Sequence, residues 1–194
     1  MSPEVYEAFA RMAEHCPGDG DVLEIGATPT PDTLLALPRF QAARSRVGLD
    51  LTGPHEAAGF RILAGQANAM TMFEPASFDV VLCNSMLEHD ARFWLTLAEI
   101  RRVIRPGGHF LVGVPGYGSM GLLRGADPAS TAWLDAAAPT LGLHDFPGDY
   151  YRFSQQAVTE VFLEGFDAVD TVSVMLPPRF IAHGVRRRGD ERLG

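Results

Sequence analysis

The first residue of chemical interest is Asp50, which ends the segment VGLD and lies 24 residues after Gly26, the last residue of DVLEIG. An acid at about that distance beyond a glycine turn, at the end of the next strand, is placed to bind ribose. A carboxylate accepts hydrogen bonds from two vicinal hydroxyls at once, which no neutral side chain does as well. The pattern therefore favours a nucleotide site, and the alternative is a solvated acid at a strand end.

One histidine and one polar cluster are candidates for acid–base chemistry. His89 follows closely on the apolar segment FDVVLC at 78–83, where a general base would reach a ligand held at the strand ends. It can equally be a histidine at the start of a helix. His144 and Tyr150 lie in a segment that also carries two aspartates. Such a cluster can orient an amine or a phenol, or it can simply pack that segment.

Apolar runs and turn signals alternate between strand and helix patterns along the chain. Helices are expected at 3–15, at 32–37 behind Asp32 as cap, at 90–104, and at 154–163 behind Ser154 as cap. Strands are expected at 21–26, 46–51, 61–64, 78–83, 109–114, 166–176 and 180–185. This alternation predicts an α/β fold with a doubly wound parallel sheet, in which ligands bind beyond the carboxyl ends of the strands.

Length, charge and cysteine content narrow the class of protein further. The 194 residues suit one domain, and the irregular segment 116–151 is expected to be a lid or a substrate-binding insertion. The net charge of −8 argues against nucleic-acid binding, and no apolar run is long enough for a transmembrane helix. Two cysteines, without a signal-peptide pattern, favour a reducing cytoplasm. No metal is expected, because HxxxH, CxxC and acidic triplets at ligand spacing are missing.

Four motifs occur in order between residues 23 and 115: LEIG, GLD, SFDVVLCNSMLEH and IRRVIRPGGHFLVGVP. With HDFPGDYYRFSQQAVTEVF and FIAHGVRRRG further on, they resemble the class I S-adenosylmethionine-dependent methyltransferases, in the small-molecule branch called type 11. The resemblance implies a Rossmann-like, three-layer αβα fold with a seven-stranded, mostly parallel sheet and an antiparallel last strand. It also implies S-adenosyl-L-methionine as cofactor and methyl transfer to O or N of a small molecule. No nucleic-acid or membrane partner is implied, and an oligomer is compatible with the sequence.

The resemblance assigns roles to individual residues. The cofactor-binding set is Glu24, Gly26, Ala27 and Thr28 beside the methionine moiety, Asp50 and Leu51 at the ribose, Gln66, Ala67 and Asn68 along the adenine, and Asn84 and Met86 at the amino-acid moiety and the sulfonium. The catalytic candidates beside this set are His89, His144 and Tyr150.

Three residues depart from the family pattern. Thr28 and Thr30 stand where glycines are usual, and their Cβ atoms would crowd a cofactor unless the loop swings wider. Gln66 replaces the usual Asp, so its contact with the adenine amino group would be neutral rather than charge-assisted. These departures motivate an alternative, a catalytically inactive methyltransferase-fold protein that serves in binding or assembly. A nicotinamide-dependent oxidoreductase is weaker, because GxGxxG is missing after the first expected strand.

Overall fold

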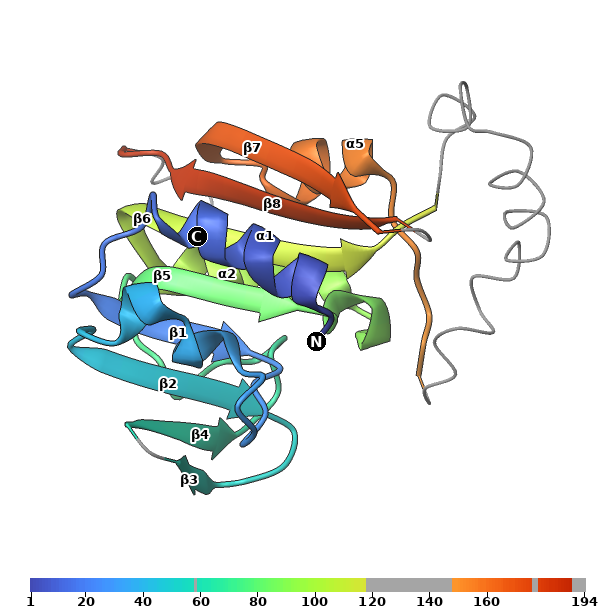
Figure 1. Cartoon of the computed structure of the whole chain (residues 1–194). Helices are drawn as coiled ribbons and strands as arrows, with labels where there is room; N and C mark the ends of the chain where they lie inside the picture. Colours follow the sequence, from blue (N-terminus) through green and yellow to red (C-terminus); the bar gives the residue numbers. More distant parts are fainter. Residues whose placement is uncertain (58, 118–147, 176–177, 190–194) are drawn as a thin grey trace.

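The computed structural model describes residues 1–57, 59–117, 148–175 and 178–189, and its centre is a sheet in the order β3-β4-β2-β1-β5-β6-β8-β7 (Figure 1). The strands are β1 (Asp21–Ile25), β2 (Ser45–Asp50), β3 (His55–Ala57), β4 (Phe60–Ala64), β5 (Phe78–Asn84), β6 (Ile104–Pro115), β7 (Phe166–Val174) and β8 (Arg179–Arg186). The helices are α1 (Pro3–Ala13), η1 (Leu34–Ala36), η2 (Pro38–Phe40), η3 (Leu87–His89), α2 (Phe93–Val103), α5 (Gln155–Ala157) and the π-turn η5 (Val158–Phe162).

The strand directions confirm the expected doubly wound sheet. Strands β4, β2, β1, β5 and β6 are paired in parallel, and β8 runs antiparallel to both of its neighbours, β6 and β7. The expected antiparallel last strand is therefore β8. All seven expected strands are present.

The sheet has one strand more than the seven expected, so the strand count is corrected to eight. The additional strand, β3, has only three residues and pairs antiparallel with β4 at the edge of the sheet. Its sequence, His-Glu-Ala, is partly exposed and carries no apolar alternation, so periodicity does not reveal it. Gly59, with a φ of +85°, lies directly before β4.

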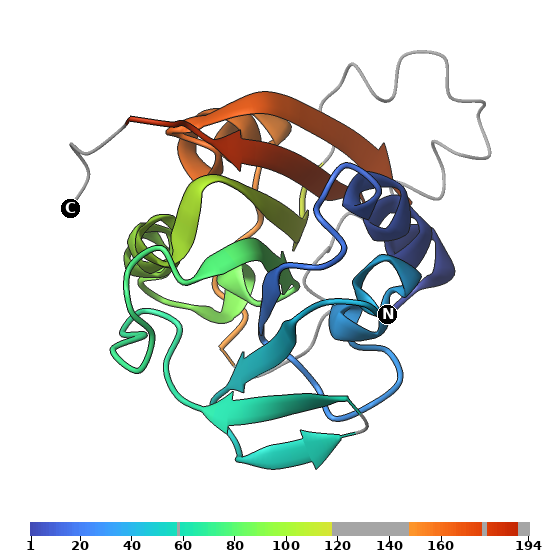
Figure 2. The same ribbon diagram turned by 90° about the vertical axis from the view of Figure 1, so that its left-hand side faces the viewer.

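Helices cover both faces of the sheet, as Figure 2 shows with α1 on one side and α2 on the other. Strand residues alternate between the two cores: Val22 of β1 packs with α1, η1 and η2, whereas Leu23 packs with α2 and η5. The same alternation directs Leu111 of β6 to the α1 face and Phe110 to the α2 face. The expected three-layer αβα arrangement is thereby confirmed.

Two of the expected helices differ in detail from the structure. Over 32–37 the chain forms the 3-10 helix η1, and Thr33 rather than Asp32 caps it, because the Thr33 hydroxyl accepts from the Leu35 amide at 3.3 Å. Over 154–163 the Ser154 cap is confirmed, with its hydroxyl 3.0 Å from the Ala157 amide. There a short α-helix passes into the π-turn η5.

An ion-pair network ties the amino ends of β1 and β5 to the start of β6. Arg105 donates to Asp79 at 2.6 Å and to Asp21 at 3.1 Å, and the Asp21 amide donates to Asp79 at 2.8 Å. Arg44 also donates to Asp21, and these guanidinium contacts hold the pKa of the Asp21 carboxyl well below its usual range. These ion pairs therefore hold the amino ends of the neighbouring strands together.

Much of the expected insertion over 116–151 lies outside the described residues, so its role as a lid stays a prediction. Within the described part, Phe153 donates its amide to Pro115 O at 3.1 Å, which brings the end of that segment back to β6. None of the helices that the structure describes is long and apolar enough to span a bilayer.

The packing of α1 on the sheet gives a first testable prediction. Phe9 is fully buried between α1 and the sheet, so Phe9→Ala is expected to lower the free energy of unfolding by about 3–5 kcal/mol. Urea unfolding followed by circular dichroism measures this loss. Trp94→Ala, on a side chain that is 51% exposed, is the aromatic control and should cost less than about 1 kcal/mol. Equal losses in the two variants would contradict this account of the core.

Candidate functional site

A cleft of about 390 Å³ opens at the carboxyl ends of β1, β2, β4 and β5. Its lining comes from the four turns that follow these strands: Ile25, Gly26, Leu49, Asp50, Leu51, Gly65, Gln66, Ala67, Asn68, Ser85, Met86, His89 and Asp90. Ligands of doubly wound sheets bind at this position, beyond the carboxyl ends of the strands. Its volume lies within the range of small-molecule sites.

The turn after β1 brings bare backbone to one wall of the cleft. Gly26 has a φ of +76°, and a Cβ added there would lie 3.1 Å from the Met86 Cβ across the cleft. The amides of Gly26 and Ala27 both donate to Leu49 O, at 2.8 and 3.3 Å. The sequence therefore needs glycine at position 26 for both the backbone conformation and the space.

Asp50 lies at the end of β2 and lines the cleft, as expected from its spacing. Its Oδ1 accepts from the amide and the hydroxyl of Thr52, at 2.9 and 2.8 Å, which fixes the carboxylate in one orientation. Because an ionised carboxylate offers about four acceptor positions, Oδ2 can still receive a ligand hydroxyl. Leu51, next in the chain, is 77% exposed at the same cleft and offers an apolar surface.

The turn after β4 contributes Gln66, Ala67 and Asn68, and all three line the cleft. The side-chain amide of Asn68 donates to the Asp90 carboxylate at 3.3 Å. Asp90 also accepts from the Thr96 hydroxyl at 2.6 Å, so α2 holds the acid in place. The structure therefore joins the turn after β4 to the turn after β5 through one carboxylate.

Glu24 is not among the residues that line the cleft, and its expected place beside a ligand stays a prediction. Its side chain is buried beneath the loop after β1, where it accepts from the Thr33 hydroxyl and from the amides of Leu34 and Leu35, at 3.1 and 3.2 Å. Burial raises the pKa of the Glu24 carboxyl to about 7, and these hydrogen bonds oppose that shift. The acid at this position therefore stabilises η1 and the preceding loop.

Three further residues of the expected cofactor set also lie outside the cleft lining. Ala27 is buried against Gly48 of β2. Thr28 is exposed and its hydroxyl lies 2.8 Å from that of Thr30, so the loop carries both threonines outward. Asn84 ends β5, and its buried Oδ1 has no hydrogen-bond partner among the residues that the structure describes. Thr28 and Thr30 are thus exposed, and whether their Cβ atoms crowd a cofactor stays a question for the binding experiment below.

Of the expected acid–base residues that the structure describes, His89 and Tyr150, only His89 lines the cleft. Its Nε2 lies 3.9 Å from Oε1 of the buried Glu88. Tyr150 donates its amide to Glu88 O at 2.8 Å, but its side chain is 58% exposed and lies outside the lining. His144 is outside the described residues, so its expected role remains a prediction.

Three residues at the cleft or behind it, Ser85, Glu88 and Arg179, were given no role by the sequence. Glu88 is buried without a hydrogen bond to its carboxylate in the described part of the chain, and Arg179 Nη2 lies 3.7 Å from its Oε1. Arg179 also donates to the Ser85 hydroxyl, and Ser85, with a φ of +52°, lines the cleft. Burial raises the pKa of the Glu88 carboxyl to about 7, and Arg179 lowers it in part. The acid of the LEH motif was a signal in the sequence that could have pointed to Glu88. The residues around Arg179 give no sign that it pairs with Glu88.

A family model matches the centre of the chain. Residues 33–112 match the model described as a methyltransferase domain, which includes the segments from β2 to β6. The match spans less than half of the chain, and together with the sheet order it supports the expected resemblance to the class I methyltransferases. No curated protein matches the chain.

Solved structures share the fold at low sequence identity. One is a putative methyltransferase in complex with the Trm112 methyltransferase activator of Haloferax volcanii, at 19% identity and a TM-score of 0.66, over 95% of this chain and 89% of that chain. Another is the 1,6-didemethyltoxoflavin-N1-methyltransferase of Burkholderia thailandensis, solved with its substrate and S-adenosylhomocysteine, at 21% identity and a TM-score of 0.67, over 96% and 80%. A third is the N-methyltransferase NodS of Bradyrhizobium japonicum with S-adenosylhomocysteine, at 13% identity and a TM-score of 0.66, over 95% and 87%.

The raised pKa of Glu88 predicts how the stability of the protein depends on pH. A carboxyl with a pKa of about 7 in the folded chain and an ordinary value of 4.5 binds more protons when folded than when unfolded. Stability is therefore highest below pH 4.5 for this group and falls as the pH rises through 7. Glu88→Gln is expected to flatten that fall by up to about 3 kcal/mol.

Urea unfolding at a series of pH values from 5 to 8 measures this pH dependence of stability, because the range includes the pH at which the folded carboxyl titrates. Glu4→Gln, on an exposed side chain of α1, is the control and should leave the pH dependence unchanged. If Glu88→Gln destabilised the protein equally at every pH, the carboxyl would be ionised throughout and the assignment would fail.

Proposed function

We propose that this protein transfers a methyl group from S-adenosyl-L-methionine to an oxygen or nitrogen of a small molecule. The observation that carries the proposal is the convergence of Gly26, Asp50, Gln66 and Met86 on one cleft, although they come from four separate turns. Each was assigned to the cofactor from the sequence motifs alone. The solved neighbours that hold S-adenosylhomocysteine support the same cofactor.

The residues of the cleft suit the chemistry of that cofactor. Asp50 presents an acceptor of fixed orientation for ribose hydroxyls, and the exposed Leu51 gives an apolar surface at the same place. Gln66 and Asn68 carry amides that can pair with the polar edge of a base. Gly26 leaves backbone exposed next to Met86, so a ligand can approach there closely.

Methyl transfer makes few demands on the protein beyond positioning and exclusion of water. The cofactor, when bound, supplies a methyl group already activated on a sulfonium. The chain must align the acceptor atom with that methyl group and remove water from the cleft. His89 is the residue proposed to take the proton of an acceptor that arrives as a hydroxyl or an ammonium, because it lines the cleft beside Met86.

One observation favours the alternative of a non-catalytic binding protein. The amides of Gly26 and Ala27 are already bonded to Leu49 O, and those of Leu34 and Leu35 are bonded to Glu24. The turn after β1 therefore presents none of these four donors to the carboxylate of the cofactor. Measured affinity for the cofactor and measured turnover distinguish the two functions.

Binding of S-adenosylhomocysteine is the primary test, measured by calorimetry on the full chain. Asp50→Ala is expected to weaken binding about 10–100-fold, because the ribose hydroxyls lose hydrogen bonds to a charged acceptor. Thr28→Ala is the matched control and should bind as the wild type does, since Thr28 lies outside the cleft. A folded wild-type protein that gave no heat at millimolar ligand would refute the proposal.

Turnover with a panel of phenols, amines and hydroxy compounds tests the role of His89. His89→Gln is expected to leave S-adenosylhomocysteine affinity nearly unchanged and to lower the methylation rate about 10²–10⁴-fold for an acceptor that must lose a proton. Production of S-adenosylhomocysteine is the measured quantity. An unchanged rate at the pH of the assay would show that His89 is not the base.

A further inference from the structure

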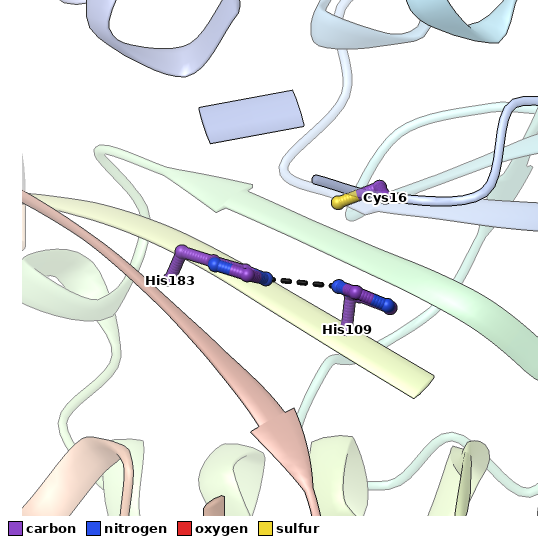
Figure 3. Close-up of side chains that lie close together, drawn as sticks. All are labelled: Cys16, His109 and His183. Carbon is purple, nitrogen blue, oxygen red and sulfur yellow. Dashed lines mark hydrogen bonds between the residues drawn. The ribbon is translucent and has the colours of Figure 1, made fainter. Parts of the chain in front are cut away.

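A second polar cluster lies away from the cleft, at the other end of β6 and on the face of the sheet covered by α1. It consists of Cys16, in the turn between α1 and β1, His109 of β6 and His183 of β8. One ligand atom from each of the three lies within 4.8 Å of the others. Figure 3 shows the two imidazoles joined end to end with Cys16 beside them.

The register of the sheet explains why these residues meet. Leu111 of β6 and Ile181 of β8 face α1, and side chains alternate between faces along a strand. His109 and His183 lie two residues from these positions, so both point to the same face. The antiparallel pairing sets His183 opposite Leu111, one step along the α1 face from His109. Cys16 then reaches them from the buried end of α1.

One nitrogen of each imidazole faces the other ring, Nδ1 of His109 and Nε2 of His183. His109 Nδ1 and His183 Nε2 are 2.9 Å apart, the ring centroids are 5.1 Å apart, and the ring planes differ by 7°. These values describe nearly coplanar rings that share an N–H···N hydrogen bond, which requires at least one nitrogen without a proton. Burial and the neighbouring histidines lower the pKa of His183 to about 4. An imidazole nitrogen without a proton is the form that binds metal ions.

We propose that Cys16, His109 and His183 bind a divalent d-block cation of the zinc type. Zn²⁺ takes nitrogen ligands at about 2.0–2.1 Å and thiolate at about 2.3 Å, so two tetrahedral nitrogens lie about 3.3 Å apart and a nitrogen and a sulfur about 3.5 Å. The imidazoles need to separate by about 0.4 Å from their present distance of 2.9 Å, and the sulfur needs to come nearer by a side-chain rotation. A thiolate with two imidazoles selects Zn²⁺ or Co²⁺ over Mg²⁺ or Ca²⁺.

The balance of protons and charge on binding is simple. The cation takes the place of the proton shared between the two rings, and that proton moves to the outer nitrogen of the ring that carried it. The cation also displaces the proton of the Cys16 thiol, which passes to solvent. The new thiolate cancels one of the two positive charges. Asp79 and Asp170 act on His109 and His183 with negative charge, and Arg39, which donates to Cys16 O at 2.8 and 2.6 Å, acts on Cys16 with positive charge.

Such a site would join three parts of the chain that are far apart in sequence. It would fasten the end of α1 to the central strand β6 and to the antiparallel strand β8. The proposal is independent of the proposed function, because the cluster lies outside the cleft lining.

Cobalt absorption tests the site on tag-free protein. Wild type titrated with Co²⁺ is expected to develop a sulfur-to-cobalt charge-transfer band and intense visible d–d bands at one equivalent, and Zn²⁺ should remove both. Cys16→Ser is expected to lose the charge-transfer band, and His183→Asn to weaken binding at least tenfold. Cys83→Ala, which removes the other buried cysteine, is the matched control and should keep the full spectrum.

The change in melting temperature gives a second measurement that does not depend on the spectrum. Zn²⁺ is expected to raise the melting temperature of the wild type and of Cys83→Ala, and to leave that of Cys16→Ser unchanged. A folded wild type without a charge-transfer band at millimolar Co²⁺ would overturn the proposal. A band that persisted in Cys16→Ser would do the same, because the metal would then use another sulfur.

Discussion

The cleft depends on one buried carboxyl group. Glu24 accepts hydrogen bonds from the Thr33 hydroxyl and from two amides of η1, those of Leu34 and Leu35. This contact draws the loop after β1 down against the α1 face of the sheet. As a result Gly26 stays beside Met86, while Thr28 and Thr30 turn toward solvent. Without that attachment the threonines would have no fixed place, and the wall of the cleft would not be defined.

A second buried carboxyl, Glu88, lies on the far side of the cleft. Both acids have a pKa raised to about 7 by burial, and neither lines the cleft itself. Buried polar groups of this kind cost stability unless they are bonded, and they define where their neighbours lie. The cleft is therefore supported from behind by Glu24 of β1, and by Glu88 of η3 with Arg179.

The sequence predicted the fold to the level of its strands because apolar runs and glycine turns report local structure. It also predicted Asp50, Gln66 and Met86 as neighbours, since the carboxyl ends of parallel strands meet at one edge. The burial of Glu24 was not predicted, because a motif gives the position of a residue along a strand but not the face to which its side chain turns. Strand β3 was missed because a three-residue edge strand has no periodicity to detect.

Spacing patterns in the sequence could not predict the contacts between segments that are far apart in the chain. Residues 16, 109 and 183 share no local motif, and only the register between β6 and β8 brings the two histidines onto one face. Arg179, the first residue of β8, likewise meets Glu88 of η3, which is far from it in the sequence. These partners are fixed by the order of strands in the sheet, which a single sequence gives only through its resemblance to a family.

The two edges of the sheet have a consequence for how the molecule behaves in a crowded solution. At one edge β3 offers only three residues, and at the other β7 is interrupted by an irregularity between Asp167 and Asp170, where Ala168 has a φ of +51°. Edge strands that are short, kinked or acidic pair poorly with a strand of another molecule. Growth of the sheet from one molecule into the next is thereby discouraged.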